Sequence, residues 1–277
     1  MNKFASKTLT ASALAIAMAF AGGVAHAATV GAPAVIQEGG ISGAAPHLMP
    51  VDQLSGQYDE VFTATGPGTF LTEAIFNAGA WFKNGSVVLS QLNGFGANGY
   101  NLYAKFSSSG TFAPSGTGFT FTGGSAYLEF WVDVNQNTDY DVAASAIGNV
   151  SNLNLVSGAG TDSDDIMLGS AALLLAGEGN AGGGLANGNF ELVFGGFSLT
   201  GTGSSYFVSP NPFYVILDLN GNFQNFIPVS GQSIQLLNNS ANAFFVPEPG
   251  VLALAGVGLL GLALGRRRGS RKTEAAA

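Results

Sequence analysis

Hydrophobic and polar side chains alternate with a period of two along much of residues 58–246. In the clearest segment, 126–132, apolar side chains at the even positions alternate with Tyr127, Glu129 and Trp131 at the odd ones. Successive side chains of a strand point to opposite faces, so this pattern predicts strands that are buried on one side. Further strands are predicted at 87–92, 102–106, 119–122, 190–194, 213–219 and 243–246. The apolar run 213–219 is typical of a strand that is buried on both sides.

Glycine punctuates these segments and predicts where the chain turns. Gly123-Gly124 is predicted to connect the two strands of a hairpin, and the glycine-rich stretch 177–188 to form a long surface loop. Only residues 166–176 could form a helix, and Gly169 argues against a long one. Many short strands without βαβ spacing favour an all-β fold, a single antiparallel β-sandwich or jelly-roll domain over residues 51–246. Residues 28–50 are predicted to be a loosely ordered leader.

The distribution of charge excludes one class of function. The chain has 277 residues, nine Lys and Arg, 17 Asp and Glu, and no cysteine. Seven of the nine cations lie at the two ends, so residues 28–246 keep only Lys83 and Lys105 against 15 acidic residues, a net charge of 2 − 15 = −13. Nucleic-acid affinity depends on cations that contact phosphates, so binding to nucleic acid is excluded. The acidic body favours divalent cations or neutral partners.

The N-terminal 27 residues have the three parts of a secretory signal peptide. Lys3 and Lys7 form a positive region, residues 11–21 are apolar, and Ala25-His26-Ala27 is a small-x-small cleavage site. The apolar stretch is too short to span a membrane, so we expect signal peptidase to cleave after Ala27. The alternative is an uncleaved membrane anchor.

A second targeting signal is predicted at the C-terminus, at residues 247–272. Its parts are the peptide Val246-Pro247-Glu248-Pro249, the uncharged run 250–265, and a basic cluster (266–272) that begins with Arg266, Arg267 and Arg268. A helix over the uncharged run is about 24 Å long, slightly short of the hydrocarbon core of a bilayer. The uncharged run therefore predicts a short transmembrane helix that enters the inner membrane transiently, with the arginines on the cytoplasmic side. The alternative is a permanent C-terminal anchor.

This tripartite C-terminus resembles the PEP-CTERM sorting signal of Gram-negative bacteria. The order of the Pro-Glu-Pro peptide, the apolar helix and the arginines carries the resemblance, although nine residues follow Arg268. The resemblance implies that an exosortase processes the protein, which is exported to the cell surface or the extracellular matrix.

Four segments of the body are similar to one group of these proteins, the flocculation-associated PEP-CTERM proteins. The segments are 58–63 (YDEVFT), 92–106 (LNGFGANGYNLYAKF), 130–138 (FWVDVNQNT) and 204–223 (SSYFVSPNPFYVILDLNGNF). This resemblance implies a secreted matrix protein that cells need in order to aggregate into flocs with extracellular polysaccharide. It implies no catalytic residues.

The residue inventory argues against an enzyme. After signal cleavage the only histidine is His47, and residues 28–246 contain neither Cys nor Arg, so common nucleophilic and phosphoryl-transfer sites lack their parts. Glycoside hydrolysis needs only two carboxylates, and Glu129 and Asp133 share one face of a predicted strand. They are about 13 Å apart along that strand, so a second strand would have to contribute. We therefore expect no enzymatic activity, with a carboxylate-based glycosidase as the least favoured alternative.

Oxygen-bearing side chains recur at every second position directly after the strand 126–132. They are Asp133, Asn135, Asn137, Asp139 and Asp141. Flexible loops of this kind hold Ca²⁺, but Thr138 and Ala144 stand where an EF-hand requires glycine and glutamate. The alternative is a polar turn whose side chains hydrogen-bond to its own backbone. A second acidic loop contains Asp162, Asp164 and Asp165.

The leading interpretation of the sequence is a non-enzymatic exported matrix or surface protein that promotes cell aggregation, and the alternative is a calcium-assisted polysaccharide-binding module. The module would use aromatic side chains that stack on sugars, with Tyr100, Tyr103, Tyr206 and Tyr214 as candidates. Burial in the core of a β-domain explains the same tyrosines without a ligand.

Overall fold

The computed structural model describes residues 33–42, 47–94, 99–116, 118–138, 140–142, 153–155, 162–181, 188–221 and 229–247. The predicted signal peptide, with Ala25 and Ala27, lies outside these residues. So does the predicted sorting segment from Glu248 onward, with Pro249 and the arginines 266–268. No helix in the described ranges is long and apolar enough to cross a membrane, and the predicted helix 250–265 is not among them.

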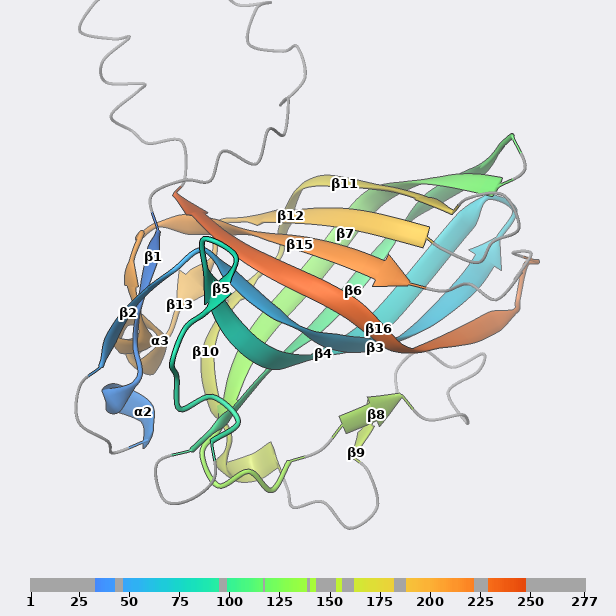
Figure 1. The fold of residues 1–277 in the computed structure, drawn as a ribbon. Helices are drawn as coiled ribbons and strands as arrows, with labels where there is room; N and C mark the ends of the chain where they lie inside the picture. The colour runs from blue at the N-terminus through green and yellow to red at the C-terminus, as the bar shows by residue number, and fades with distance from the viewer. Residues whose placement is uncertain are drawn as a thin grey trace, which may run out of the picture. The chain divides into compact units, whose positions relative to one another are not determined.

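Eight antiparallel strands form a closed barrel (Figure 1). In spatial order they are β3 (Gln53–Gly66), β4 (Thr69–Lys83), β6 (Asn101–Ser115), β7 (Gly118–Asp133), β11 (Leu173–Ala181), β12 (Gly188–Gly195), β15 (Phe213–Gly221) and β16 (Ser233–Pro247). β16 pairs with β3, and β11 pairs with β7, so the sheet has no free edge in this ring. The predicted all-β fold is confirmed, but the predicted sandwich is wrong.

The length of β7 explains why the sheet closes. It has 16 residues, and it uses its two halves for different partners. Residues 119–122 pair with β11, whereas residues 128–132 pair with β10 (Ile166–Ala171). β10 also pairs with the short strand β13 (Ser198–Leu199). The segment considered for a helix, 166–176, is therefore strand, and its second part completes the barrel.

Aromatic side chains fill the interior of the barrel. The inward-facing residues 126, 128, 130 and 132 are buried, as the alternation predicts. Near one end, Phe62 stacks on Phe70 at 5.4 Å between ring centroids and meets the edge of Phe121 at 5.7 Å. An eight-stranded barrel is just wide enough for side chains to fill, so its interior is a packed core.

The glycine pair predicted to form a hairpin lies instead inside β7. Gly123 pairs with Gly110 of β6 at a bulge, and a Cβ on Gly110 would collide with the carbonyl oxygen of Thr122. These glycines allow a close approach of two backbones, and the hairpin turn is formed further back, at Gly116, whose φ is +61°. The predicted hairpin at Gly123-Gly124 is wrong. The first part of the predicted loop 177–188 is also strand, because β11 extends to Ala181.

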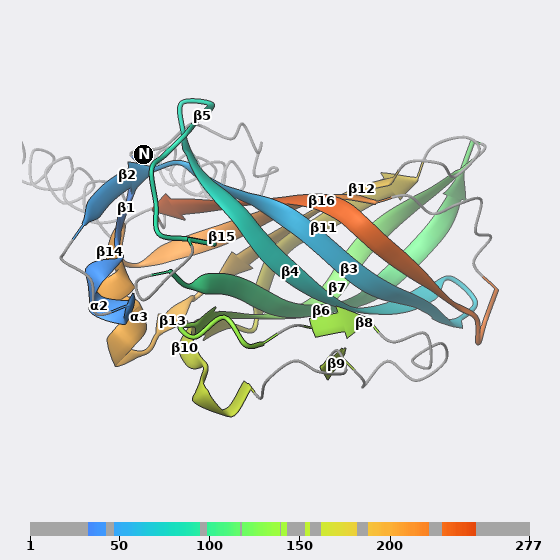
Figure 2. The same ribbon diagram turned by 60° about the horizontal axis from the view of Figure 1, so that its bottom comes forward.

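Residues that the sequence assigns to a leader form part of a lid over one end of the barrel (Figures 1 and 2). The lid consists of β1 (Ala34–Gln37), α2 (Gly39–Ser42), β2 (Leu48–Val51), α3 (Gly201–Tyr206) and β14 (Phe207–Ser209). β1 lies between β2 and β14 in a three-stranded sheet. Its apolar side chains alternate over only four residues, too few to mark a strand, yet Ala34 and Ile36 are buried in the barrel core.

Three smaller elements lie outside the barrel ring. β5 (Ser86–Val87) extends β4, and η2 (Asp162–Asp164) is a single turn of 3₁₀ helix before β10. β8 (Tyr140–Val142) and β9 (Leu153–Leu155) form a two-stranded sheet beside β3 and β4. The long strand β16 is hydrogen-bonded on both sides, to β15 and to β3, and its last residue, Pro247, pairs with Phe213.

Candidate functional site

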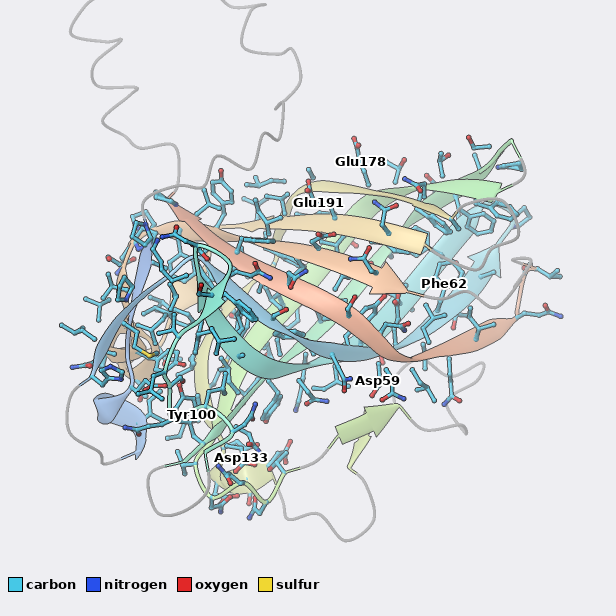
Figure 3. The ribbon with its side chains drawn as sticks, viewed as in Figure 1. Asp59, Phe62, Tyr100, Asp133, Glu178 and Glu191 are labelled. Atoms are coloured by element: carbon cyan, nitrogen blue, oxygen red, sulfur yellow. The ribbon has the colours of Figure 1, made fainter. Side chains whose placement is uncertain are left out.

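The predicted calcium loop begins with a carboxylate that is fully buried. Asp133 lies at the end of β7 (Figure 3), where it accepts hydrogen bonds from the backbone N–H groups of Asn135 (3.2 Å) and Thr138 (2.9 Å). The side-chain oxygen of Asn135 accepts from the N–H of Asn137 at 3.3 Å. This part of the loop therefore has the geometry of a turn that satisfies its own backbone.

Calcium binding at this loop stays a prediction. Asp139 and the side chain of Asp141 lie outside the described residues. Within the described ranges, no three His, Asp or Glu side chains are placed to share a metal ion.

The two acidic loops, which are separate in the sequence, meet on the outer wall of the barrel. The side-chain amide of Asn135 donates a hydrogen bond to Asp164 in η2. Asp165 accepts a hydrogen bond of 2.6 Å from the Tyr103 hydroxyl on β6. Burial raises the pKa of Asp165, and the hydrogen bond from Tyr103 partly opposes this shift.

Lys105 is one of the two cations in residues 28–246, and neighbouring side chains hold it in place. Its ammonium group lies 3.3 Å from Asp162 and 5.3 Å from the centre of the Trp131 ring. The other cation, Lys83, lies 3.6 Å from Asp52. Both positive charges are therefore paired with carboxylates of the same chain.

A polar pocket of about 420 Å³ lies beside these loops. Its lining residues come from β4, β6 and two loops, and they are Asn77, Ala78, Asn93, Asn101, Leu102, Tyr103, Gln136 and Thr138. Four of the eight are amides, each of which carries both a donor and an acceptor. The chemistry of this lining suits a ligand with many hydroxyl groups.

Two of the amides are fixed in position by the backbone. The Asn93 amide donates to the carbonyl oxygens of Ala78 (2.8 Å) and Gly79 (2.9 Å), and the Gln136 amide donates to that of Gly94 (2.7 Å). Asn93 and Gln136 have φ values of +55° and +56°. Left-handed backbone is unfavourable for residues with a Cβ, and such strained positions concentrate at binding sites. Two of the four described non-glycine residues with a positive φ therefore line the pocket, whereas Asn84 and Asn238 lie elsewhere.

Sequence reasoning missed these four amides. Asn93 and Asn101 lie in the segment 92–106, which carries part of the family resemblance, but nothing local distinguishes them from ordinary turn residues. Gln136 is passed over because it falls between the positions that would ligate calcium. The Asn93-Gly94 pair is the one usable signal, since Asn before Gly favours a left-handed turn.

The candidate tyrosines are mostly core residues. Tyr100 and Tyr206 have no exposed surface, Tyr103 is 3% exposed, and Tyr214 is partly buried. The hydroxyls of Tyr100 and Tyr206 lie 2.8 Å apart, in a T-shaped ring pair. Packing in the core therefore accounts for three of the four, and only Tyr103 also lines the pocket.

A buried carboxylate that the sequence did not reveal holds the lid in place. Glu38 follows β1 and has no exposed surface. It accepts hydrogen bonds from the hydroxyls of Ser90 (2.5 Å) and Tyr100 (2.8 Å), from the backbone N–H of Gln91 (3.1 Å), and from His47 (3.3 Å). These donors come from the lid and from the chain between β5 and β6, so Glu38 joins the two.

The carboxylate pair considered for glycoside hydrolysis is occupied by hydrogen bonds within the protein. Glu129 accepts from the Tyr127 hydroxyl at 2.6 Å and from the Trp131 indole N–H at 3.0 Å. Asp133 is buried beneath its own loop. The geometry gives neither carboxylate an open position beside the other.

Comparison with known proteins bears on the C-terminal end of the chain. Residues 245–268 match the family model described as the PEP-CTERM protein-sorting motif. This motif indicates an exported protein. It is targeted to an exosortase and directed to the cell surface. No curated protein and no solved structure matches the chain.

We expect Asp133→Ala to lower the free energy of unfolding by about 1–3 kcal/mol, because two backbone N–H groups lose the carboxylate that accepts their hydrogen bonds. Urea denaturation with EDTA present measures this loss without any bound cation.

The calcium hypothesis makes a separate prediction, a Ca²⁺-dependent rise in the melting temperature of the wild type that the double variant Asp133→Ala, Asp139→Ala loses. NaCl at equal ionic strength is the control for screening. A melting temperature of the wild type that EDTA leaves unchanged would show that the loop is only a polar turn.

Proposed function

We propose that the protein is a non-enzymatic component of the extracellular matrix of a Gram-negative cell, and that it promotes cell aggregation by binding exopolysaccharide. The sorting motif at residues 245–268 supports export to the cell surface, where matrix polymers are located. The observation that carries the polysaccharide part is the pocket, because four amides and the Tyr103 ring line it.

The chemistry of the pocket favours a sugar over other small ligands. Sugars present hydroxyl groups that both donate and accept, and the amides of Asn77 and Asn101 can do the same. Asn93 uses both of its N–H groups on backbone carbonyls, so it offers its oxygen as an acceptor. The nearby carboxylates and the absence of a free described cation disfavour anionic ligands such as nucleotides. The involvement of Glu129 and Asp133 in internal hydrogen bonds supports a binding role over hydrolysis.

The binding experiment compares exported protein with a variant that has a smaller set of amides. Asn77→Ala with Asn101→Ala removes two pocket amides for which the described residues offer no side-chain hydrogen bond. We expect affinity for the exopolysaccharide of the producing cells to fall about tenfold, because two hydrogen bonds of about 0.5–1.5 kcal/mol each are lost.

The matched control is Thr111→Ala with Ser115→Ala, which alters two exposed side chains on β6 outside the pocket. Co-sedimentation with the polymer measures binding, and the same variants in producing cells report on aggregation. Wild-type protein that does not co-sediment with the polymer, or pocket variants that bind as well as the control, would contradict the proposal.

A further inference from the structure

One polar side chain from each of six neighbouring strands lies in a row that runs around the outside of the barrel. We call it the amide row, and it consists of Asn180 (β11), Asn189 (β12), Asn220 (β15), Ser240 (β16), Gln57 (β3) and Asn77 (β4). Each residue is the direct cross-strand partner of the next. All six side chains therefore project from the same face of the sheet.

All six side chains of the amide row are exposed. Within the described ranges, none of them hydrogen-bonds to the side chain or backbone of another residue. Asn is depleted in strands, so four asparagines at paired positions are not what strand formation alone selects. The row offers solvent a line of unused donors and acceptors.

The amide row runs into the pocket. Asn77 is its last member and also lines the pocket, and the residue opposite Asn77 on β6 is Tyr103, which lines the pocket as well. Adjacent strands are about 4.8 Å apart, so the six positions cover about 24 Å. The row follows the curved outer wall of the closed barrel, so a bound chain must bend around the barrel as it passes from one strand to the next.

Carboxylates flank the other end of the row. Glu178, Glu191 and Asp218 are cross-strand partners of one another, two residues along their strands from the first three members of the row. Glu178 and Glu191 lie on the outer face of the barrel (Figure 3). Uronate or phosphate groups on a bound chain would meet repulsion here, whereas hydroxyls, acetamido groups and amines would not.

We propose that the amide row extends the pocket into a track for a polysaccharide chain that carries no acidic groups. This inference rests on the proposed function, and it adds the class of polymer and the path that the chain follows. The pocket alone accommodates a short oligosaccharide, whereas a longer one also reaches the row. Affinity must therefore increase with chain length, and the increase must depend on row residues that are far from the pocket.

The test uses oligosaccharides of two and eight residues in three chemical forms, which are glucosamine, N-acetylglucosamine and galacturonate. Isothermal titration is carried out on the exported protein, on a row variant (Asn180→Ala, Asn189→Ala, Asn220→Ala), and on the control Thr111→Ala, Ser115→Ala. Because the substituted side chains are exposed, we expect all three proteins to unfold at closely similar urea concentrations.

We expect the wild type to bind the eight-residue amine-bearing and neutral oligomers more tightly than the two-residue ones. The row variant should lose about tenfold in affinity for the long oligomers, since three hydrogen bonds disappear, and nothing for the short ones. The control should match the wild type, and the galacturonate octamer should bind more weakly than the other two octamers.

Several results would overturn the track. The track would be ruled out by equal affinity for long and short oligomers, or by a row variant that binds octamers as well as the wild type. Either result would leave the pocket and the proposed function intact. Preferential binding of galacturonate refutes the assignment of polymer class. If the wild type binds no oligosaccharide and no exopolysaccharide, the proposed function itself fails.

Discussion

Between pH 4.5 and 8 the wild type should lose stability as the pH rises, because Glu60 titrates in the unfolded chain. The variant Glu60→Gln should lack this contribution to the pH dependence of the free energy of unfolding. Glu60 projects from β3 into the barrel, where it is 3% exposed. Burial raises its pKa from 4.5 to about 8, partly opposed by a hydrogen bond from Thr72. Tyr58, on the same inner face, stays protonated because burial raises its pKa too.

The direction of the effect follows from where the proton is held. Between pH 4.5 and 8 the folded protein keeps a proton on Glu60 that the unfolded chain releases, so stability falls as the pH rises. At about 1.4 kcal/mol per pH unit, the whole change amounts to about 5 kcal/mol. Below pH 4.5 both forms are protonated, and wild type and variant should be equally stable.

Urea denaturation at pH 4, 6 and 9 measures the difference between the two proteins. Glu73→Gln on the neighbouring strand is the comparison variant, because its side chain points outward and is only partly buried. Burial also raises the pKa of Glu73, so we expect a change of the same sign but smaller than that of Glu60→Gln. We expect Glu60→Gln to be the more stable protein at pH 9 by several kcal/mol. Parallel pH profiles for wild type and Glu60→Gln would show that Glu60 is charged in the folded barrel.

Replacement of Glu38 by alanine should destabilise the protein by about 3 kcal/mol or more and release the lid. The change leaves the Ser90 and Tyr100 hydroxyls and the Gln91 N–H without the buried carboxylate that accepts their hydrogen bonds. Removing the centre of such a buried network costs more than the loss of a single hydrogen bond. Denaturation gives the loss in stability, and limited proteolysis within residues 33–51 detects release of the lid.

Two further variants separate the network from its parts. Tyr100→Phe removes one hydrogen bond and should cost about 1 kcal/mol. His47→Ala should cost less, because the His47 side chain is 47% exposed and its bond of 3.3 Å is the longest of the set. Equal proteolysis of the Glu38→Ala variant and the wild type would mean that the apolar contacts of β1 and β2 hold the lid without Glu38.

The sequence predicts most strands because their signal is local. Alternation over residues 126–132 needs only one strand and one buried side, and the structure has that pattern. Closure of the barrel depends on the pairing of Gly179 with Phe121 and of Ala241 with Gly56, which are contacts between distant segments. A single strand looks the same in a sandwich and in a barrel, so the architecture could not be predicted from alternation.

The candidate site was harder to predict for a related reason. Asp133 and Asp164 bear charges and can be recognised one loop at a time, and the structure brings their loops together. The amides Asn77 and Gln136 are ordinary polar residues in the sequence. They become a site only because strand register and a left-handed turn place them around one cavity.

The double pairing of β16 has a mechanical consequence for an exported protein. A pull on the chain at Pro247, where the sorting motif adjoins the barrel, is directed along a strand of 15 residues. Hydrogen bonds of antiparallel ladders lie perpendicular to the strands, so such a pull loads the bonds to β15 and β3 together, in shear. The bonds cannot open one after another like a zipper. If the protein is tethered through this residue, drag from flowing water therefore loads the barrel in shear. This is the direction in which paired antiparallel strands resist separation most strongly.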